Sequence, residues 1–201
     1  STKINSISYT GTNNIRTLIN NETPYINVLY NKIKISTNLI GDYQFDNIRL
    51  AICVANYFKI SMENIKKAIS EYMPKNNRSQ VIKTKTNTVI LDAYNANPSS
   101  MMQMLKSFSS IKEEKKVCIL GEMGELGVFS NQEHVYIIDL VKKLKLNTFF
   151  IGKKFSSLEK QNSFLNIEDF NKYLKKNKIK NSTILVKGSR SVKLEKVITE
   201  L

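Results

Sequence analysis

Residues 90–101 read Ile-Leu-Asp-Ala-Tyr-Asn-Ala-Asn-Pro-Ser-Ser-Met, and they join a predicted strand to a predicted helix. The apolar run at 88–91 is typical of a buried strand. Asn97 is a residue type that caps helices, and Pro98 fits the first helical turn, where its missing N–H costs nothing. In open α/β sheets, ligands bind where strand carboxyl ends meet helix amino ends. The turn is therefore our first candidate for a site, with a well-capped loop as the alternative, and its polar side chains are Asp92, Tyr94, Asn95 and Asn97.

Apolar strands alternate with helices through the second part of the chain. Four strand candidates lie at 88–91, 117–120, 148–151 and 183–186. Helical spacing of apolar residues follows, with one helix after Asn166 and a last helix over 194–201. This alternation predicts an α/β fold with a parallel sheet covered on both faces. Right-handed crossovers would bring all four strand carboxyl ends to one edge.

Charged residues and glycines follow these strands at that edge. The residues that directly follow the four predicted strands are Asp92, Gly121-Glu122, Gly152-Lys153 and Lys187-Gly188. The segment Lys187-Gly188-Ser189-Arg190 combines backbone donors, a hydroxyl and two cations, which suit a carboxylate or a phosphate. Glu122 and Glu125 either hold a substrate ammonium or belong to a solvated acidic loop.

The first part of the chain reads differently. Residues 1–40 are β-rich, with a strand at 25–30, alternation at 33–35, and turns at 13–14 and 20–21. Two helices follow, one after Gly41 and one capped by Ser61, and the second must end before Pro74. The polar stretch after it predicts a domain boundary near 74–79, which divides the chain into 1–76 and 77–201. The sequence opens without a start of its own, so we expect a piece of a longer protein.

Composition restricts the functional class. The chain has 201 residues, 41% of them hydrophobic, and no run as long as a membrane span. It shows no secretory signal, and its two cysteines lie in apolar segments, which favours buried free thiols and a cytoplasmic location. The net charge of +14 favours nucleic acid by itself. Because the lysines are spread over polar helix faces, we expect no specific nucleic-acid binding.

The sequence contains no complete catalytic motif. It has no Gly-x-x-x-x-Gly-Lys-Ser/Thr loop and no zinc-type Cys/His spacing, so no metal-ligating residues are predicted. The single histidine, His134, lies on an apolar stripe and is expected to pack half-buried rather than act as a general base. Ser130 and Glu133 before it predict a capping box. Asp92 and Arg78 are the strongest candidates for chemistry, because each lies at a junction.

From about residue 35 onward the sequence resembles the Mur ligases. The resemblance rests on motifs in a common order, with Gln44 and Glu122 in place of the family's usual Asn and Asp. These motifs are Gly-Asp-Tyr-Gln-Phe-Asp-Asn at 41–47, Asn77-Arg78, Asp-Ala-Tyr-Asn-Ala-Asn-Pro at 92–98, Leu-Gly-Glu-Met-Gly-Glu-Leu-Gly at 120–127 and Lys-Gly-Ser-Arg at 187–190.

The resemblance implies a three-domain cytoplasmic enzyme of peptidoglycan precursor synthesis. Residues 1–76 would be the C-terminal part of its α/β P-loop-type central ATP-binding domain, without the P-loop. Residues 77–201 would be its C-terminal domain, with a Rossmann-like, mostly parallel sheet. The implied reaction uses ATP and Mg²⁺ to form an acyl phosphate on UDP-N-acetylmuramoyl-tripeptide, which the amine of D-alanyl-D-alanine attacks. A monomer is expected, and this chain alone is expected to be inactive.

The resemblance also implies roles for individual residues. Asn47 would border the adenine, Arg78 would reach the terminal phosphates, and Asp92 would hold the ribose. Arg78 and Asp92 are thus the implied catalytic and ATP-binding residues. The dipeptide would be bound by Tyr94, Asn95 and Asn97, with Lys187, Ser189 and Arg190 near its carboxylate.

Two other functions remain open on the sequence. One is a non-catalytic α/β module that binds a small zwitterion or nucleotide. The other is a nucleic-acid-binding protein, which would show steep salt dependence.

Overall fold

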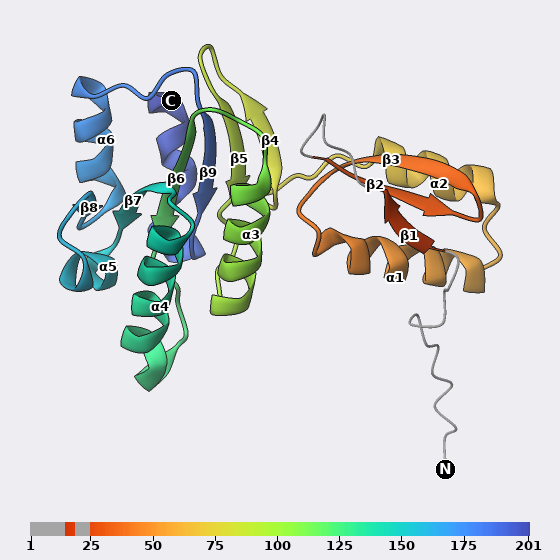
Figure 1. Cartoon of the computed structure of the whole chain (residues 1–201), viewed down its shortest axis with the longest axis horizontal. Coiled ribbons are helices and arrows are strands. Elements are labelled where there is room, and N and C mark those ends of the chain that lie inside the picture. Colours follow the sequence, from red (N-terminus) through yellow and green to blue (C-terminus); the bar gives the residue numbers. More distant parts are fainter. Residues whose placement is uncertain (1–14, 19–24) are drawn as a thin grey trace. The chain divides into compact units, whose positions relative to one another are not determined.

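The computed structural model describes residues 15–18 and 25–201. The turns predicted at 13–14 and 20–21 lie outside the described residues. The chain divides into two compact units, residues 1–73 and residues 74–201 (Figure 1). The second unit thus begins within the region predicted as a boundary.

The first unit is an antiparallel three-stranded sheet with two helices. Its strands are β1 (Ile15–Leu18), β2 (Tyr25–Tyr30) and β3 (Ile33–Ile40), and its helices are α1 (Gln44–Tyr57) and α2 (Met62–Glu71). Asn31 and Lys32 both have positive φ, as a two-residue hairpin turn between twisted strands requires. The Ser61 hydroxyl caps α2, as predicted, by accepting from the Asn64 N–H.

The second unit is built on a six-stranded sheet. Its order is β4-β5-β9-β6-β7-β8, and only β4 runs antiparallel to its neighbour. The predicted mostly parallel α/β sheet is thus confirmed, and the four predicted strands all form. The strand bounds are β4 (Gln80–Lys83), β5 (Thr88–Asp92), β6 (Lys116–Gly121), β7 (Asn147–Ile151), β8 (Ser163–Phe164) and β9 (Thr183–Lys187).

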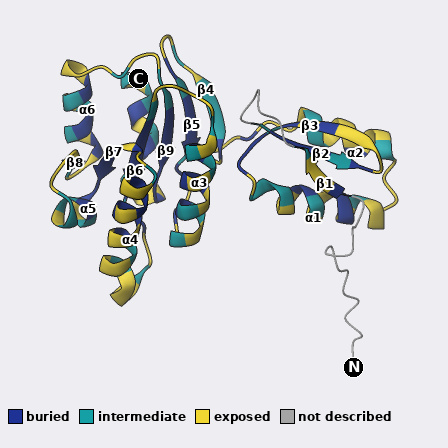
Figure 2. Cartoon of the chain, in the orientation of Figure 1, coloured by how far each residue is buried: buried dark blue, intermediate teal, exposed yellow. Residues whose placement is uncertain are grey.

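Helices cover the sheet, which is buried between them (Figure 2). One core cluster joins alternate strand residues, such as Val89 and Ile119, to α6 (Ile167–Lys176) and to the last helical segment. Ile90 and Cys118, between these positions, are also buried, and so are the apolar sides of α3 (Pro98–Ser110) and α4 (Ser130–Lys143). The remaining helices are short: α5 (Lys153–Leu158) and the 3₁₀ segments η1 (Gly127–Phe129), η2 (Arg190–Val192) and η3 (Leu194–Glu200).

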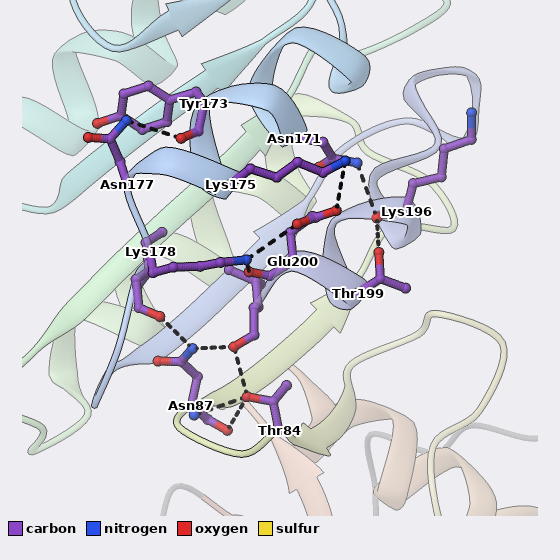
Figure 3. Close-up of polar contacts among 12 residues, drawn as sticks. Thr84, Asn87, Asn171, Tyr173, Lys175, Asn177, Lys178, Lys196, Thr199 and Glu200 are labelled. Atoms are coloured by element: carbon purple, nitrogen blue, oxygen red, sulfur yellow. Dashed lines mark hydrogen bonds and ion pairs between the residues drawn. The ribbon is translucent and has the colours of Figure 1, made fainter.

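The last predicted helix forms as 3₁₀ turns and not as an α-helix. Lys193 is left-handed between η2 and η3, which interrupts the regular helix. Side chains then hold the segment in place (Figure 3). Buried Asn87 donates to the carbonyl of Leu201 at 2.7 Å, and Lys178 donates to the Glu200 carbonyl at 3.2 Å.

Two further expectations concern the chain's environment. Cys53 and Cys118 are buried thiols and form no disulfide, as predicted, and burial raises the pKa of the Cys118 thiol. Within residues 15–18 and 25–201, no helix combines the length and the apolar character needed to cross a bilayer.

Candidate functional site

The strand ends converge as the alternation predicted. Strand β9 lies between β5 and β6, and all three run parallel. In this register Lys187 lies opposite Asp92 on one side and Leu120 on the other. The turns after β5, β6 and β9 therefore leave the sheet at one edge.

Asp92 and Lys187 form a buried ion pair at this edge. The ammonium of Lys187 lies 2.5 Å from Oδ2 of Asp92, and the lysine is only 2% exposed. The other carboxylate oxygen of Asp92 accepts from the backbone N–H of Ser79 at 3.0 Å. The two charges thus hold together the ends of β5 and β9 and the turn that precedes β4.

That turn has an unusual backbone. Asn76, Asn77 and Ser79 all have φ between 51° and 58°, in the left-handed region that asparagine tolerates better than most residues. The carbonyl of Asn77 accepts from the N–H of Tyr94 at 3.2 Å. As a result the guanidinium of Arg78 lies over the Tyr94 ring, 3.8 Å from its centre, where a cation–π interaction holds it.

An open cavity of about 840 Å³ lies at this edge. It combines two guanidinium groups, one carboxylate, three amides and a phenol, so it offers both signs of charge to a ligand. Four of the predicted site residues line it, namely Arg78, Tyr94, Asn95 and Arg190, together with Asn76, Asn77 and Glu125. The sequence reasoning missed Asn76 and Asn77 as site residues, although asparagine is a residue type that tolerates the left-handed backbone found here.

The other predicted site residues have partners within the protein. The Asn97 side chain accepts from the Ser100 N–H at 2.8 Å and caps α3, as the sequence predicted. Ser189 is buried and its N–H donates to the Glu122 carbonyl at 3.1 Å. Asn47, on α1 of the first unit, is exposed and donates to Gln44 at 2.8 Å. The structure thus brings four predicted residues to the cavity, and the ligand roles of all the predicted site residues, these four included, remain predictions.

Glu122 and Glu125 turn out to have different surroundings. Glu122 accepts from the backbone N–H of Lys154 at 2.9 Å, at the start of α5. Glu125 is exposed and lines the cavity. Of the two carboxylates, only Glu125 is therefore presented to a ligand there.

Two glycines allow the loops to approach each other. A Cβ on Gly188 would lie 2.8 Å from the Cα of Gly121, closer than a side chain tolerates against backbone. The loops after β6 and β9 can therefore meet this closely because position 188 lacks a side chain, and a Cβ on Gly121 would also be tight, at 3.3 Å from the Cα of Gly188.

His134 is more deeply buried than the sequence suggested. It is fully buried, with one ring nitrogen 3.0 Å from the Met123 backbone nitrogen and the other 2.6 Å from the Ser130 carbonyl. Burial lowers its pKa. The capping box predicted at Ser130 and Glu133 does not form, because η1 runs directly into α4 and leaves Phe129 at the cap position with no side-chain bond.

No group of three or more His, Cys, Asp or Glu side chains that could hold a metal occurs within residues 15–18 and 25–201.

Comparisons with known proteins identify the family of this chain. The family model described as "Mur ligase, glutamate ligase domain" matches residues 77–190. A UDP-N-acetylmuramoyl-tripeptide–D-alanyl-D-alanine ligase of Buchnera aphidicola from Acyrthosiphon pisum is 33% identical over 178 residues, and the match covers 85% of this chain and 39% of that protein. The ligase of the same name from Bacillus subtilis is 28% identical, with 81% of this chain and 38% of that protein covered. The chain thus spans about two fifths of the length of these curated relatives.

Solved structures share the fold. MurF of Thermotoga maritima, in complex with ADP, matches with a TM-score of 0.76 at 17% identity, covering 93% of this chain and 45% of that one. MurF of Acinetobacter baumannii matches with a TM-score of 0.74 at 24% identity, covering 94% and 44%. The family model covers more than half of the 201 residues and includes the cavity residues from Asn77 to Arg190. This chain belongs to the Mur ligase family.

Proposed function

We propose that this chain is the C-terminal part of an ATP-dependent amide ligase that joins D-alanyl-D-alanine to UDP-N-acetylmuramoyl-tripeptide. Its relatives at 28–34% identity carry that name. The observation that carries the proposal is the cavity at the strand edge, which offers carboxylate, guanidinium and amide groups together. A zwitterionic dipeptide needs this combination.

Each end of the dipeptide has a matching group in the cavity. Arg190 suits the terminal carboxylate, since a guanidinium pairs with it through two parallel hydrogen bonds. Glu125 suits the amino group, and Asn95 and Tyr94 can hydrogen-bond the peptide unit between them. Because the cavity is open, the dipeptide could enter and leave without a change in the sheet.

The same cavity has a place for phosphate. Arg78 is exposed and its guanidinium is already held over the Tyr94 ring, so it is oriented before any ligand arrives. Such preorganised positive charge stabilises a transition state more than a mobile lysine would. We assign Arg78 to the terminal phosphates of ATP. In this reaction ATP supplies the energy by converting the tripeptide carboxylate to an acyl phosphate.

Asp92 and Lys187 support this arrangement from below the surface. The Asp92 carboxylate accepts from the Ser79 N–H and so fixes the turn on which Arg78 lies. Lys187 neutralises that carboxylate. Contact of Asp92 with the ribose, and of Lys187 and Ser189 with the dipeptide carboxylate, is part of the proposal. Asn97 would border the dipeptide from the start of α3.

The rest of the assignment follows from the family. We assign residues 1–76 to the C-terminal part of the central ATP-binding domain, with Asn47 beside the adenine, and residues 77–201 to the Rossmann-like C-terminal domain. Mg²⁺ would bind together with the nucleotide. We propose a monomeric cytoplasmic enzyme.

Titration with D-alanyl-D-alanine tests the proposal. The expected result is a saturable change in backbone amide shifts at residues 92–98 and 187–190. Asn95→Ala should weaken binding, whereas Gln103→Ala, which removes an exposed amide on α3, should not. Saturable shifts elsewhere only, or equal affinity of both variants, would move the dipeptide out of this cavity.

A further inference from the structure

His134 connects α4 to the loop that carries Glu125. The loop runs from Gly121 to Gly127, and its first residues are held by their neighbours: Glu122 donates to the Ile151 carbonyl at 3.0 Å and accepts from Ser189 at 3.1 Å. The next residue, Met123, is 4% exposed, and its N–H is directed at the His134 ring. Glu125, two residues further on, lines the cavity.

The two hydrogen bonds of the ring define its protonation state. A carbonyl can only accept, so Nδ1 must carry the hydrogen that it donates to Ser130 at 2.6 Å. A backbone N–H can only donate, so Nε2 must be bare to accept from Met123 at 3.0 Å. The neutral tautomer with hydrogen on Nδ1 satisfies both partners.

The surroundings of the ring favour this state. His134 is fully buried, and its ring packs edge-on against Phe155, with 4.7 Å between ring centres. The charged groups that act on it are Glu122 beside the loop, Lys154 on α5 and Glu133 on its own helix. Burial has the largest effect and lowers the pKa of His134. The bond to the Ser130 carbonyl and the two carboxylates favour a protonated ring, Lys154 opposes it, and burial outweighs the groups that favour protonation.

We infer that His134 is a positioning residue for the ligand cavity, which it serves by accepting from the Met123 N–H and so setting where the loop presents Glu125. The inference rests on the proposed function only in its identification of the ligand. The ring does not line the cavity, so it acts through the loop and not on the substrate. At acidic pH a second proton on Nε2 would point at the Met123 N–H. The hydrogen bond between them would then be lost, and the loop would no longer be held by the ring.

The chain contains one histidine, so its ring gives an unambiguous NMR signal. Long-range ¹⁵N–¹H correlation at neutral pH should show hydrogen on Nδ1 and not on Nε2. The opposite tautomer would overturn the inference, because Nε2 could then not accept from Met123.

Three variants separate positioning from simple packing. His134→Leu keeps similar volume without an acceptor, His134→Gln retains an oxygen that can accept from Met123, and Phe155→Leu removes ring packing but keeps both hydrogen bonds. His134→Leu should shift the amide signals of residues 122–126 in the ligand-free chain. It should also raise the Kd for D-alanyl-D-alanine about three- to tenfold, the range expected for one hydrogen bond. His134→Gln and Phe155→Leu should change Kd by less than about twofold.

The outcomes are distinguishable. If the unmodified chain does not bind the dipeptide, the proposed function fails, and the ligand-free amide shifts alone decide whether His134 sets the loop. If His134→Leu and Phe155→Leu give the same shifts and the same Kd, His134 only fills space and the inference is wrong.

Discussion

The Asp92–Lys187 pair shows what single residues contribute and what the sequence reveals of them. Both residues were identified as site candidates because each ends a strand. Their pairing could not be read from the sequence, because it depends on β9 inserting between β5 and β6. Strand order is a property of the folded chain. The sequence thus located both charges at the correct edge and left their partnership open.

Removing Lys187 should strongly destabilise the second unit. Lys187→Met leaves the Asp92 carboxylate largely buried without its counter-charge, which typically costs about 3–5 kcal/mol. The free energy of unfolding can be measured in urea from the NMR signals of residues 74–201. Asp92→Asn combined with Lys187→Met should cost less than the sum of the two single changes. Strict additivity would show that the pair is not coupled, and Lys106→Met on the exposed side of α3 serves as a control.

Arg78 is expected to act on the reaction and not on the fold. In the full-length ligase, Arg78→Ala should remove about 2–4 kcal/mol of transition-state stabilisation, as for other preorganised charge donors. The value of kcat/KM should fall accordingly. Arg78→Lys should recover only part of this, since lysine lacks the planar fork. Steady-state kinetics with both variants and with Lys106→Ala would check this. A near-normal kcat/KM for Arg78→Ala would remove Arg78 from the phosphate site.

Elements were predicted well where apolar periodicity was long, and poorly where it was short. The four central strands and helices α1, α2, α3, α4 and α6 all form where the pattern indicated. Strands β1, β4 and β8 and helix α5 were missed, because they have only two to six residues and too few apolar positions for a period. The last segment has helical spacing but forms η3, since left-handed Lys193 prevents an α-helix from starting at η2.

Segment η3 should depend on Asn87. The buried side chain donates to the carbonyls of Ile179 and Leu201 and accepts from the Ser182 N–H at 3.1 Å. Asn87→Ala leaves these groups unpaired and should destabilise the second unit by about 2–4 kcal/mol. Asn171→Ala, which removes one 3.3 Å bond to the same segment, should cost much less. Hydrogen exchange at residues 194–201 would report the loss locally, and unchanged protection in Asn87→Ala would contradict the role.

At the scale of the whole molecule, the position of the cavity was the most predictable feature. Parallel strands joined by right-handed crossovers bring their carboxyl ends together whatever side chains they carry. The complete burial of His134 was not predictable. It depends on the loop that contains Met123, and the sequence of that loop has no apolar periodicity from which its position could be inferred. A sequence therefore locates a site of this class more readily than it explains how the site is held.

The stability of the second unit should fall on acidification. Burial lowers the pKa of His134 below 6.5, and bonds from Lys142 and Lys196 lower the pKa values of Glu159 and Glu168 below 4.5. In each case the unfolded chain binds more protons, so the contribution is complete above the ordinary pKa and is lost as pH falls through the folded one. The Glu159 bond also raises the pKa of Lys142, whose contribution is lost only above pH 10.5.

Urea midpoints between pH 8 and pH 4 would test this. Both carboxylates titrate below pH 4.5, so most of the loss above pH 5 should come from His134. His134→Gln has no group that titrates there, and its midpoint should stay nearly constant from pH 7 to pH 5 while that of the unmodified chain falls. If the urea midpoints of the two proteins instead fall in parallel with pH, protonation of His134 does not destabilise the fold. The hydrogen bond between His134 and the loop would then not be the contact that is sensitive to acid.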